Sequence, residues 1–380
     1  MTDDRATERE FAPEEILDEI LLSMIDGVGP RLSARLYERF GSVQAILDAP
    51  AAELETVEKI GPKISRQIAS ARKLYQPAEL VELCQKSGIM ILHRSDARYP
   101  RRLREIIDPP TILYVRGTIE PQDALAIAVV GTRGMSYYGR KQTERIAGEL
   151  ARAGFTIVSG LAAGVDGAAH DSALLAGGRT LAVLGSGVLK IFPSQHEKLA
   201  ERVIERGALI SEFHPFADPL SGNFPQRNRI VSGLSLGVLV VESPRRSGSL
   251  ITARLATEQN REVFAVPGPV DVENSRGCHQ LLRDGAKLVE TADDILEELG
   301  PLPLPVPSHQ KSPGEVRHPA EMKLNEREKA VLALIETTPI SVDLLIERSH
   351  LAPSQLLAVI TVLEAKRLIR RCEGNRVARL

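Results

Sequence analysis

The chain has 380 residues, of which 43% are hydrophobic and 26% are charged, and its formal net charge at pH 7 is −2. This length and composition are typical of a soluble globular protein with two or three domains. The near-neutral balance excludes a globally basic nucleic-acid-binding protein, so any such role must rest on local charge. The chain has no tryptophan and few aromatic residues, which disfavours base stacking as a mode of recognition.

The N-terminal residues MTDDRATERE are charged and lack the apolar segment of a signal peptide. No run of 18 apolar residues occurs along the chain. The three cysteines, Cys84, Cys278 and Cys372, are isolated, which indicates neither a zinc site nor a disulfide framework and fits a reducing compartment. We therefore expect a disordered segment over residues 1–14, a cytoplasmic location and no membrane association.

Residues 15–76 show the pattern of a helical domain. Apolar residues recur at helical spacing around Gly27-Val28-Gly29-Pro30, and a weaker copy surrounds Ile60-Gly61-Pro62-Lys63. Helix, glycine-containing turn and helix is the arrangement of a helix-hairpin-helix, or SAM-like, unit. The glycines would let backbone N–H groups approach a DNA phosphate, but a turn between two packed helices needs no ligand. Both interpretations stay open.

Residues 77–299 favour an α/β domain, because continuous apolar strands alternate with helices from Leu125 onward. The strands are predicted at 126–130, 156–158, 180–184, 208–210, 238–241 and 262–265, with two more at 89–92 and 112–115 in a short αβ extension. This alternation predicts a Rossmann-like, doubly wound and mostly parallel sheet.

Several predicted strands end in glycine and serine, among them the strands before Gly131, Gly160 and Gly185. In an open parallel sheet, ligands bind beyond the carboxyl ends of the strands, so these turns should converge on one crevice. Neither the three-glycine dinucleotide fingerprint nor a Walker A sequence is present. The crevice therefore favours phosphate groups without being an NAD or ATP site, and we expect no cofactor.

The stretch from Gly222 to Ala253 should form one wall of that crevice. It begins with Arg227-Asn228-Arg229 before a predicted helical turn at Asn228–Leu234, and Ser247-Gly248-Ser249 precede a helix predicted from Leu250. A polar turn at a helix N-terminus attracts anions, and the arginines strengthen that interpretation. Serine and glycine at such turns also serve simply as helix caps, so this stretch alone does not distinguish an anion site from capping.

A catalytic set is hard to assemble. Asp166 and His170 lie four residues apart on one helix face, but no third ligand accompanies them. Because Asp166 lies at a helix start, we expect it to cap the helix or to complement the helix dipole. Glu242 directly follows a strand, and we expect it to hold Arg229 or Arg133 in position. We therefore predict no catalytic residue and no metal site.

Residues 300–320 contain six prolines and predict an extended linker. Residues 321–380 predict three helices, at 326–336, 341–348 and 354–366, and two short strands around Gly374, which is a winged helix. Its end is rich in positive charge, with Lys366, Arg367, Arg370, Arg371, Arg376 and Arg379 against Glu373. That excess suits a phosphate backbone. Winged helices also dock proteins, so the partner of this domain stays open.

Five motifs together resemble the DNA-processing protein A (DprA/Smf) family: VVGTR (129–133), SGLAAGVDGAAH (159–170), FPQRNRIVSGLS (224–235), SGSLITA (247–253) and VFAVPG (263–268). The resemblance covers about residues 20–300, and the winged helix agrees with many members. It implies a homodimeric, non-enzymatic protein that binds and protects incoming single-stranded DNA and loads RecA recombinase onto it in natural transformation.

The resemblance also implies the DNA-binding residues: Arg133, Ser159, Gly160, Lys198, Arg227, Asn228, Arg229, Ser247, Gly248 and Ser249. The chain departs from the family pattern at Ala163, where an arginine is common, and at Phe192, where tyrosine usually precedes Pro193. The first departure removes one possible phosphate contact.

A second hypothesis is a nucleotide-processing enzyme of the related phosphoribohydrolase superfamily. That group carries a double-glycine PGGxGT segment with a catalytic glutamate, whereas this chain reads SPRRSGSL at the matching place. The sequence therefore favours the DNA-binding hypothesis.

Overall fold

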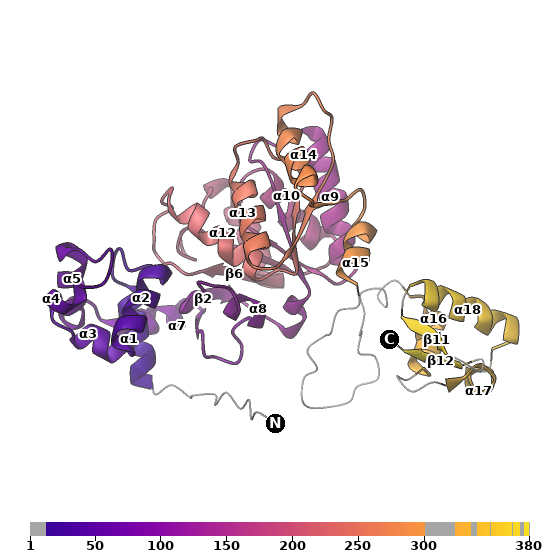
Figure 1. The fold of residues 1–380 in the computed structure, drawn as a ribbon, viewed down its shortest axis with the longest axis horizontal. Coiled ribbons are helices and arrows are strands. Elements are labelled where there is room, and N and C mark those ends of the chain that lie inside the picture. The colour runs from indigo at the N-terminus through magenta and orange to yellow at the C-terminus, as the bar shows by residue number, and fades with distance from the viewer. Residues whose placement is uncertain are drawn as a thin grey trace.

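The computed structural model describes residues 13–300, 324–335, 340–349, 351–366, 368–372 and 376–379. These form an N-terminal helical region, a central α/β region and a C-terminal winged helix (Figure 1). The expected disordered segment and the proline-rich linker lie almost entirely outside the described residues.

The N-terminal region consists of short helices: α1 (Pro13–Ser23), α2 (Pro30–Phe40), α3 (Val43–Asp48), α4 (Ala51–Leu54), α5 (Pro62–Ala69) and α6 (Ala71–Leu74). Gly29 and Gly61 are the N-caps of α2 and α5, and a proline begins each helix, where its missing N–H and fixed φ do no harm. Leu36, Ile46 and Ile68 are fully buried between the helices. The predicted tandem of helix-hairpin-helix units is confirmed.

The central region is built on a nine-stranded sheet in the order β1-β2-β6-β5-β4-β3-β7-β8-β9. The strands are β1 (Ile89–His93), β2 (Ile112–Gly117), β3 (Ala126–Val130), β4 (Thr156–Ser159), β5 (Thr180–Val183), β6 (Gly207–Ser211), β7 (Gly237–Val240), β8 (Glu262–Ala265) and β9 (Lys287–Leu288). From β6 to β9 all neighbours pair in parallel, whereas β2 pairs antiparallel with both β6 and β1. The predicted doubly wound, mostly parallel sheet is confirmed, and β9 is a strand that the sequence pattern did not reveal.

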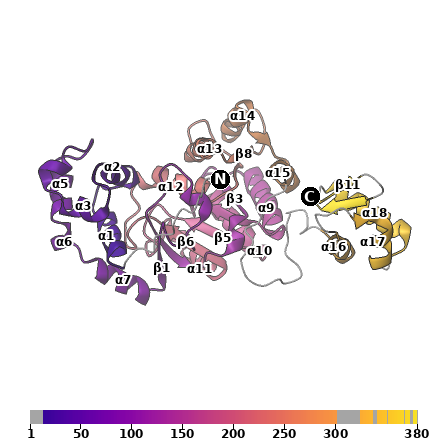
Figure 2. The same cartoon turned by 60° about the horizontal axis from the view of Figure 1, so that its bottom comes forward.

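Helices cover both faces of the sheet. Ala128 and Val130 of β3 face a cluster with α8 (Arg101–Arg104), α12 (Asn223–Gly233), α13 (Gly248–Glu258) and α14 (Arg276–Arg283). Ile127 and Val129 face a cluster with α9 (Tyr137–Arg152), α10 (Val165–Leu175) and α15 (Ala292–Leu299). Figure 2 shows the strands between α12 and α13 on one side and α10 and α11 (Glu197–Arg206) on the other. Because both faces are buried, every residue of β3 is apolar.

The N-terminal helices pack on the same sheet through a third hydrophobic cluster. Ile20 of α1 and Leu80 of α7 (Pro77–Lys86) belong to one hydrophobic cluster with Tyr114 of β2 and Leu209 of β6. The helical region is therefore anchored to the sheet at the β1–β2 side.

The chain winds from β3 through β4 and β5 to β6, then returns to place β7 on the other side of β3. The loops after β3 and β7 therefore leave the sheet in diverging directions. In doubly wound folds this switch point opens the ligand-binding crevice.

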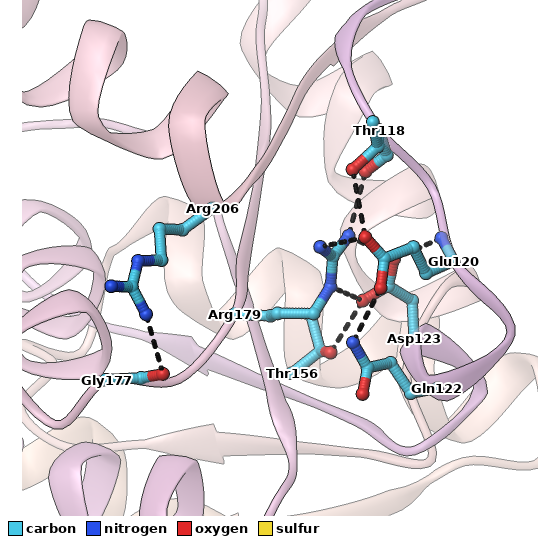
Figure 3. Close-up of polar contacts among 8 residues, drawn as sticks. All are labelled: Thr118, Glu120, Gln122, Asp123, Thr156, Gly177, Arg179 and Arg206. Carbon is cyan, nitrogen blue, oxygen red and sulfur yellow. Dashed lines mark hydrogen bonds and ion pairs between the residues drawn. The ribbon is translucent and has the colours of Figure 1, made fainter.

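At the amino ends of β4 and β5, a partly buried ion-pair network joins η1 (Pro121–Ala124) to the sheet (Figure 3). Arg179 donates two hydrogen bonds of 2.9 Å to the carboxylate of Asp123 and one of 2.8 Å to Glu120. Thr156 Oγ1 donates to Asp123 at 2.7 Å. This network is structural and lies away from the carboxyl ends of the strands.

The C-terminal elements are α16 (Glu326–Ala333), β10 (Ile340–Ser341), α17 (Val342–Ser349), α18 (Pro353–Ala365), β11 (Ile369–Cys372) and β12 (Arg376–Arg379). They confirm the winged helix. Arg370 and Arg376 are exposed, whereas Lys366 pairs with Glu328 at 3.2 Å. Arg367 and Glu373 of the expected basic end lie outside the described residues. No helix in the described part of the chain is long and apolar enough to cross a membrane.

Candidate nucleic-acid interface

Arg133 stands at the switch point, in the loop after β3. Its side chain is exposed, and its guanidinium carbon lies 5.5 Å from the centre of the Phe224 ring. A hydrogen bond joins this loop to the residues after β7, because the Thr132 N–H donates to the Glu242 carbonyl at 2.7 Å. A rigid backbone thus presents a cation to solvent beside an aromatic face.

The Phe224 ring beside this cation also meets a second phenylalanine, Phe192. Phe192 is 43% exposed, and its ring centre lies 5.7 Å from that of half-buried Phe224. Phe224 covers Gly185 after β5, where a Cβ would come within 2.8 Å of the ring, so only glycine fits there. The low aromatic content had argued against stacking, and nothing local in the sequence showed that these two rings meet.

The N-terminus of α13 forms the adjoining wall. Ser247 is its N-cap, and the Ser247 hydroxyl accepts from the Ser249 N–H at 3.3 Å. The Ser249 hydroxyl turns inward and donates to Ser243 Oγ at 3.0 Å. Gly248 is exposed with no neighbour near its Cα face, so this end of the helix stays open to an anion.

The segment containing the arginine cluster is a full helix, α12, rather than the short turn predicted at 228–234. Pro225 falls in the first helical turn, where proline is tolerated. Asn228 donates from its amide to the Gly248 carbonyl at 3.2 Å, so it joins α12 to the N-terminus of α13.

Arg227 and Arg229 are both buried, at 4% and 3% exposure. Arg229 donates two hydrogen bonds of 2.6 Å to the Glu212 carboxylate and one of 3.0 Å to the Asp108 carbonyl. Burial lowers the pKa of Arg229, but the Glu212 and Asp108 carboxylates outweigh that effect and raise it. The sequence predicts that Arg229 contacts DNA phosphates. In the structure its guanidinium is hydrogen-bonded inside the protein, where Glu212 at the end of β6 neutralises its charge.

Arg227 points toward the end of β4. Its Nη1 donates to the Gly160 carbonyl at 2.9 Å. Burial lowers the pKa of Arg227 to about 10, the Asp166 carboxylate opposes that effect, and the charge of Arg133 adds to it. Arg227 thus stays protonated near neutral pH and lies close enough to Arg133 for their charges to interact.

Ser159, Gly160 and Asp166 are buried at and after the end of β4. Ser159 is fully buried and donates to the Val129 carbonyl at 2.6 Å. Asp166, in the first turn of α10, accepts from the Gly160 N–H at 3.1 Å, and Gly160 lies outside that helix. Asp166 therefore does not cap α10, whose N-cap is Gly164, although its place in the first turn suits the helix dipole. His170 Nδ1 is hydrogen-bonded to Thr180 Oγ1 at 2.6 Å, and burial lowers the pKa of His170 to about 3. Asp166 and His170 therefore have separate partners.

Glu242 does not hold Arg133 or Arg229, and that prediction is wrong. Its carboxylate accepts from the Ser136 N–H at 2.8 Å and from the Ser136 hydroxyl at 2.5 Å. Ser136 is the N-cap of α9, where a negative charge is favoured by the helix dipole. Gly139 makes room for the carboxylate, since a Cβ there would lie 2.3 Å from Glu242 Oε2.

Lys198 lies exposed in the first turn of α11, the helix that follows β5. The neighbouring His196 bonds to the Leu161 carbonyl at 2.9 Å, which joins this helix start to the loop after β4. The structure therefore brings Arg133, Lys198, Asn228, Ser247 and Gly248 to the surface at the carboxyl edge of the sheet. Ser159, Gly160, Arg227, Arg229 and Ser249 lie below it.

Family models match three parts of the chain. DNA recombination-mediator protein A matches residues 90–300, the DprA winged helix domain matches 315–375, and a SAM-like helix-hairpin-helix tandem matches 19–74.

Curated relatives include Protein Smf from Synechocystis sp., 40% identical over 74% of this chain and 72% of the relative. DNA processing protein DprA from Streptococcus pneumoniae is 43% identical over 53% of this chain and 72% of the relative.

Among solved structures, DprA from Streptococcus pneumoniae has a TM-score of 0.65 and 34% identity, covering 76% of this chain and 98% of that one. DNA processing protein A from Helicobacter pylori, whose structure describes a single-stranded DNA binding mode, has a TM-score of 0.51 and 30% identity, covering 56% and 95%. The switch point and its loops thus lie in a fold shared with these proteins, and the chain belongs to the DNA recombination-mediator protein A (DprA/Smf) family.

Proposed function

We propose that this chain binds single-stranded DNA along the carboxyl edge of its sheet and acts as a recombination mediator in natural transformation. The observation that carries the proposal is Arg133, an exposed cation held over the Phe224 ring beside the open N-terminus of α13. Cations and helix N-termini bind phosphates, and aromatic faces stack unpaired bases of any sequence. A duplex, whose bases are already stacked, cannot use the rings in this way.

A mediator passes its DNA to another protein, so we propose RecA recombinase as the partner, a homodimer as the working unit and the cytoplasm as its location. The single-stranded DNA binding described for the Helicobacter pylori relative supports the ligand. We propose no reaction at the crevice. The Glu242 carboxylate after β7 is 3% exposed and accepts a hydrogen bond from Ser136 at the N-terminus of α9. A buried and hydrogen-bonded carboxylate is poorly placed to act as a catalytic glutamate, which weighs against the phosphoribohydrolase hypothesis.

Fluorescence anisotropy with a labelled 30-nucleotide single strand and the matching duplex, over a series of salt concentrations, tests the ligand. We expect preferential, sequence-tolerant binding of the single strand that weakens as salt rises. RecA filament growth on strands coated with single-strand-binding protein, with and without this chain, tests the partner. Equal binding of strand and duplex, or release of a base from a nucleoside monophosphate, would contradict the proposal.

Ala163 offers a gain-of-function test. It is exposed in the loop after β4, at the position where the family often has arginine. Ala163→Arg should raise affinity for the single strand by roughly two- to tenfold at low salt, because one more cation can neutralise one more phosphate. The uncharged Ala163→Gln variant, measured in the same titration, should bind like the native chain. Equal gains in both variants would show that charge is not the cause.

A further inference from the structure

Two buried side chains of opposite charge, Asp166 and Arg227, meet at the turn after β4. Asp166 is 8% exposed and Arg227 4% exposed, and both contact Gly160, the residue that follows β4. Asp166 accepts from the Gly160 N–H at 3.1 Å, and Arg227 donates to the Gly160 carbonyl at 2.9 Å. Both polar groups of one turn residue are thus satisfied by side chains from two different helices, α10 and α12.

The turn held in this way supports the Arg133 loop from below. Val165 N–H donates to the Thr132 carbonyl at 3.2 Å. Gly164 adopts φ of +82°, and a Cβ there would lie 2.3 Å from the Thr132 carbonyl oxygen. A Cβ on Gly131 would come within 2.6 Å of Val165. The loops after β3 and β4 therefore touch through backbone atoms, and a shift of one must move the other.

The Arg227 side chain exposes too little surface to contact DNA directly. Its Nη1 is committed to Gly160, and its side chain is enclosed between α12 and the end of β4. A single buried charge is costly, whereas a paired one is tolerated if its hydrogen bonds are made. Asp166 supplies an opposite charge nearby, and the Gly160 carbonyl accepts one hydrogen bond, while the buried Nε of Arg227 has no hydrogen-bond partner among the described residues.

Resting on the proposed function, we infer that Asp166 and Arg227 are positioning residues of the DNA site: together they lock the turn at Gly160–Val165, which fixes the backbone from which Arg133 reaches the phosphate. They act on the strand through Arg133, without touching it. Loss of either charge should therefore weaken DNA binding only as far as Arg133 contributes to it.

A double-mutant cycle between Asp166→Asn and Arg133→Ala tests the inference, with anisotropy titrations of the same single strand. Asp166→Asn alone should weaken binding by roughly tenfold and lower the salt dependence, as Arg133→Ala does. In the Arg133→Ala background, Asp166→Asn should cost less than about twofold more, because the contact it positions is already gone. Equal losses in both backgrounds would overturn the inference. If Arg133→Ala alone binds like the native chain, the proposed site itself fails, which is a separate outcome.

Asp123→Asn is the matched control. Asp123 is likewise a buried carboxylate, ion-paired with Arg179, but it lies where β4 and β5 begin (Figure 3). It should lower thermal stability without changing affinity or salt dependence, so a mere loss of stability cannot imitate the expected result. An affinity loss in Asp123→Asn equal to that of Asp166→Asn would count against positioning.

Asp166→Asn leaves Arg227 buried without a nearby opposite charge, so a second variant controls for loss of folding. Combining it with Arg227→Met removes both charges and keeps the side-chain volume similar. This double variant should recover stability but still bind the strand roughly tenfold more weakly, because Gly160 has lost its carbonyl partner. Native-like affinity in the folded double variant would overturn the inference.

Discussion

Replacing Arg133 with alanine is expected to weaken single-stranded DNA binding by roughly 10- to 100-fold, the largest effect on affinity of any single change in the crevice. A hydrogen bond between charged groups contributes about 1.5–3 kcal/mol, and Arg133 is the exposed arginine that the structure places over an aromatic ring at the switch point. Loss of one phosphate contact should also lower the slope of log affinity against log salt by about 0.7 for a single strand. Anisotropy titrations at several salt concentrations measure both quantities.

Arg206→Ala is the control for charge. Arg206 is an exposed arginine at the end of α11, on the side of the sheet shown in Figure 3, where it donates to the Gly177 carbonyl at 3.3 Å. Its loss changes the net charge by the same amount and should leave affinity nearly unchanged. Arg133→Lys should fall between the native chain and Arg133→Ala, because lysine keeps the charge but not the planar group that stacks on Phe224. Native affinity in Arg133→Ala would refute the site.

Replacing Arg229 with alanine should instead destabilise the folded state by about 3–5 kcal/mol, the largest stability effect expected here. The change removes a guanidinium that is 3% exposed and leaves the Glu212 carboxylate buried without its partner. Far-UV circular dichroism during urea unfolding measures the loss, since the chain has no tryptophan to report by fluorescence.

Arg229→Met combined with Glu212→Leu separates structure from binding. Removal of both charges avoids an unpaired buried group, so most of the lost stability should return. If the doubly substituted protein binds the single strand like the native chain, Arg229 is structural. A stable double variant with affinity reduced as far as in Arg133→Ala would show that Arg229 contacts DNA directly.

The strands were predictable because both faces of the central sheet are buried. Continuous apolar runs such as 126–130 follow directly from that burial, and the glycine and serine turns after them indicated which edge carries the site. Helix-hairpin-helix turns and the winged helix were equally visible, since glycine, proline and apolar spacing are local signals.

The partners of the charged residues were not predictable in the same way. Arg227, Asn228 and Arg229 are neighbours in sequence, yet one contacts the turn after β4, one contacts α13 and one is neutralised by Glu212 after β6. Successive residues on a helix point about 100° apart, so only the surrounding elements decide what each one meets. Glu242 was misassigned for the same reason, because its partner Ser136 lies 106 residues away.

The sequence by itself thus determined the class of fold and the family, and it indicated the end of the sheet where we propose the DNA site, because each rests on local pattern and motif. Only the tertiary structure decided which cations reach the surface and which are paired inside the protein. It also decided that the Phe224 ring lies beside both Phe192 and Arg133. The physical reason is that burial and charge pairing depend on residues brought together across the sheet, about which a linear pattern carries no information.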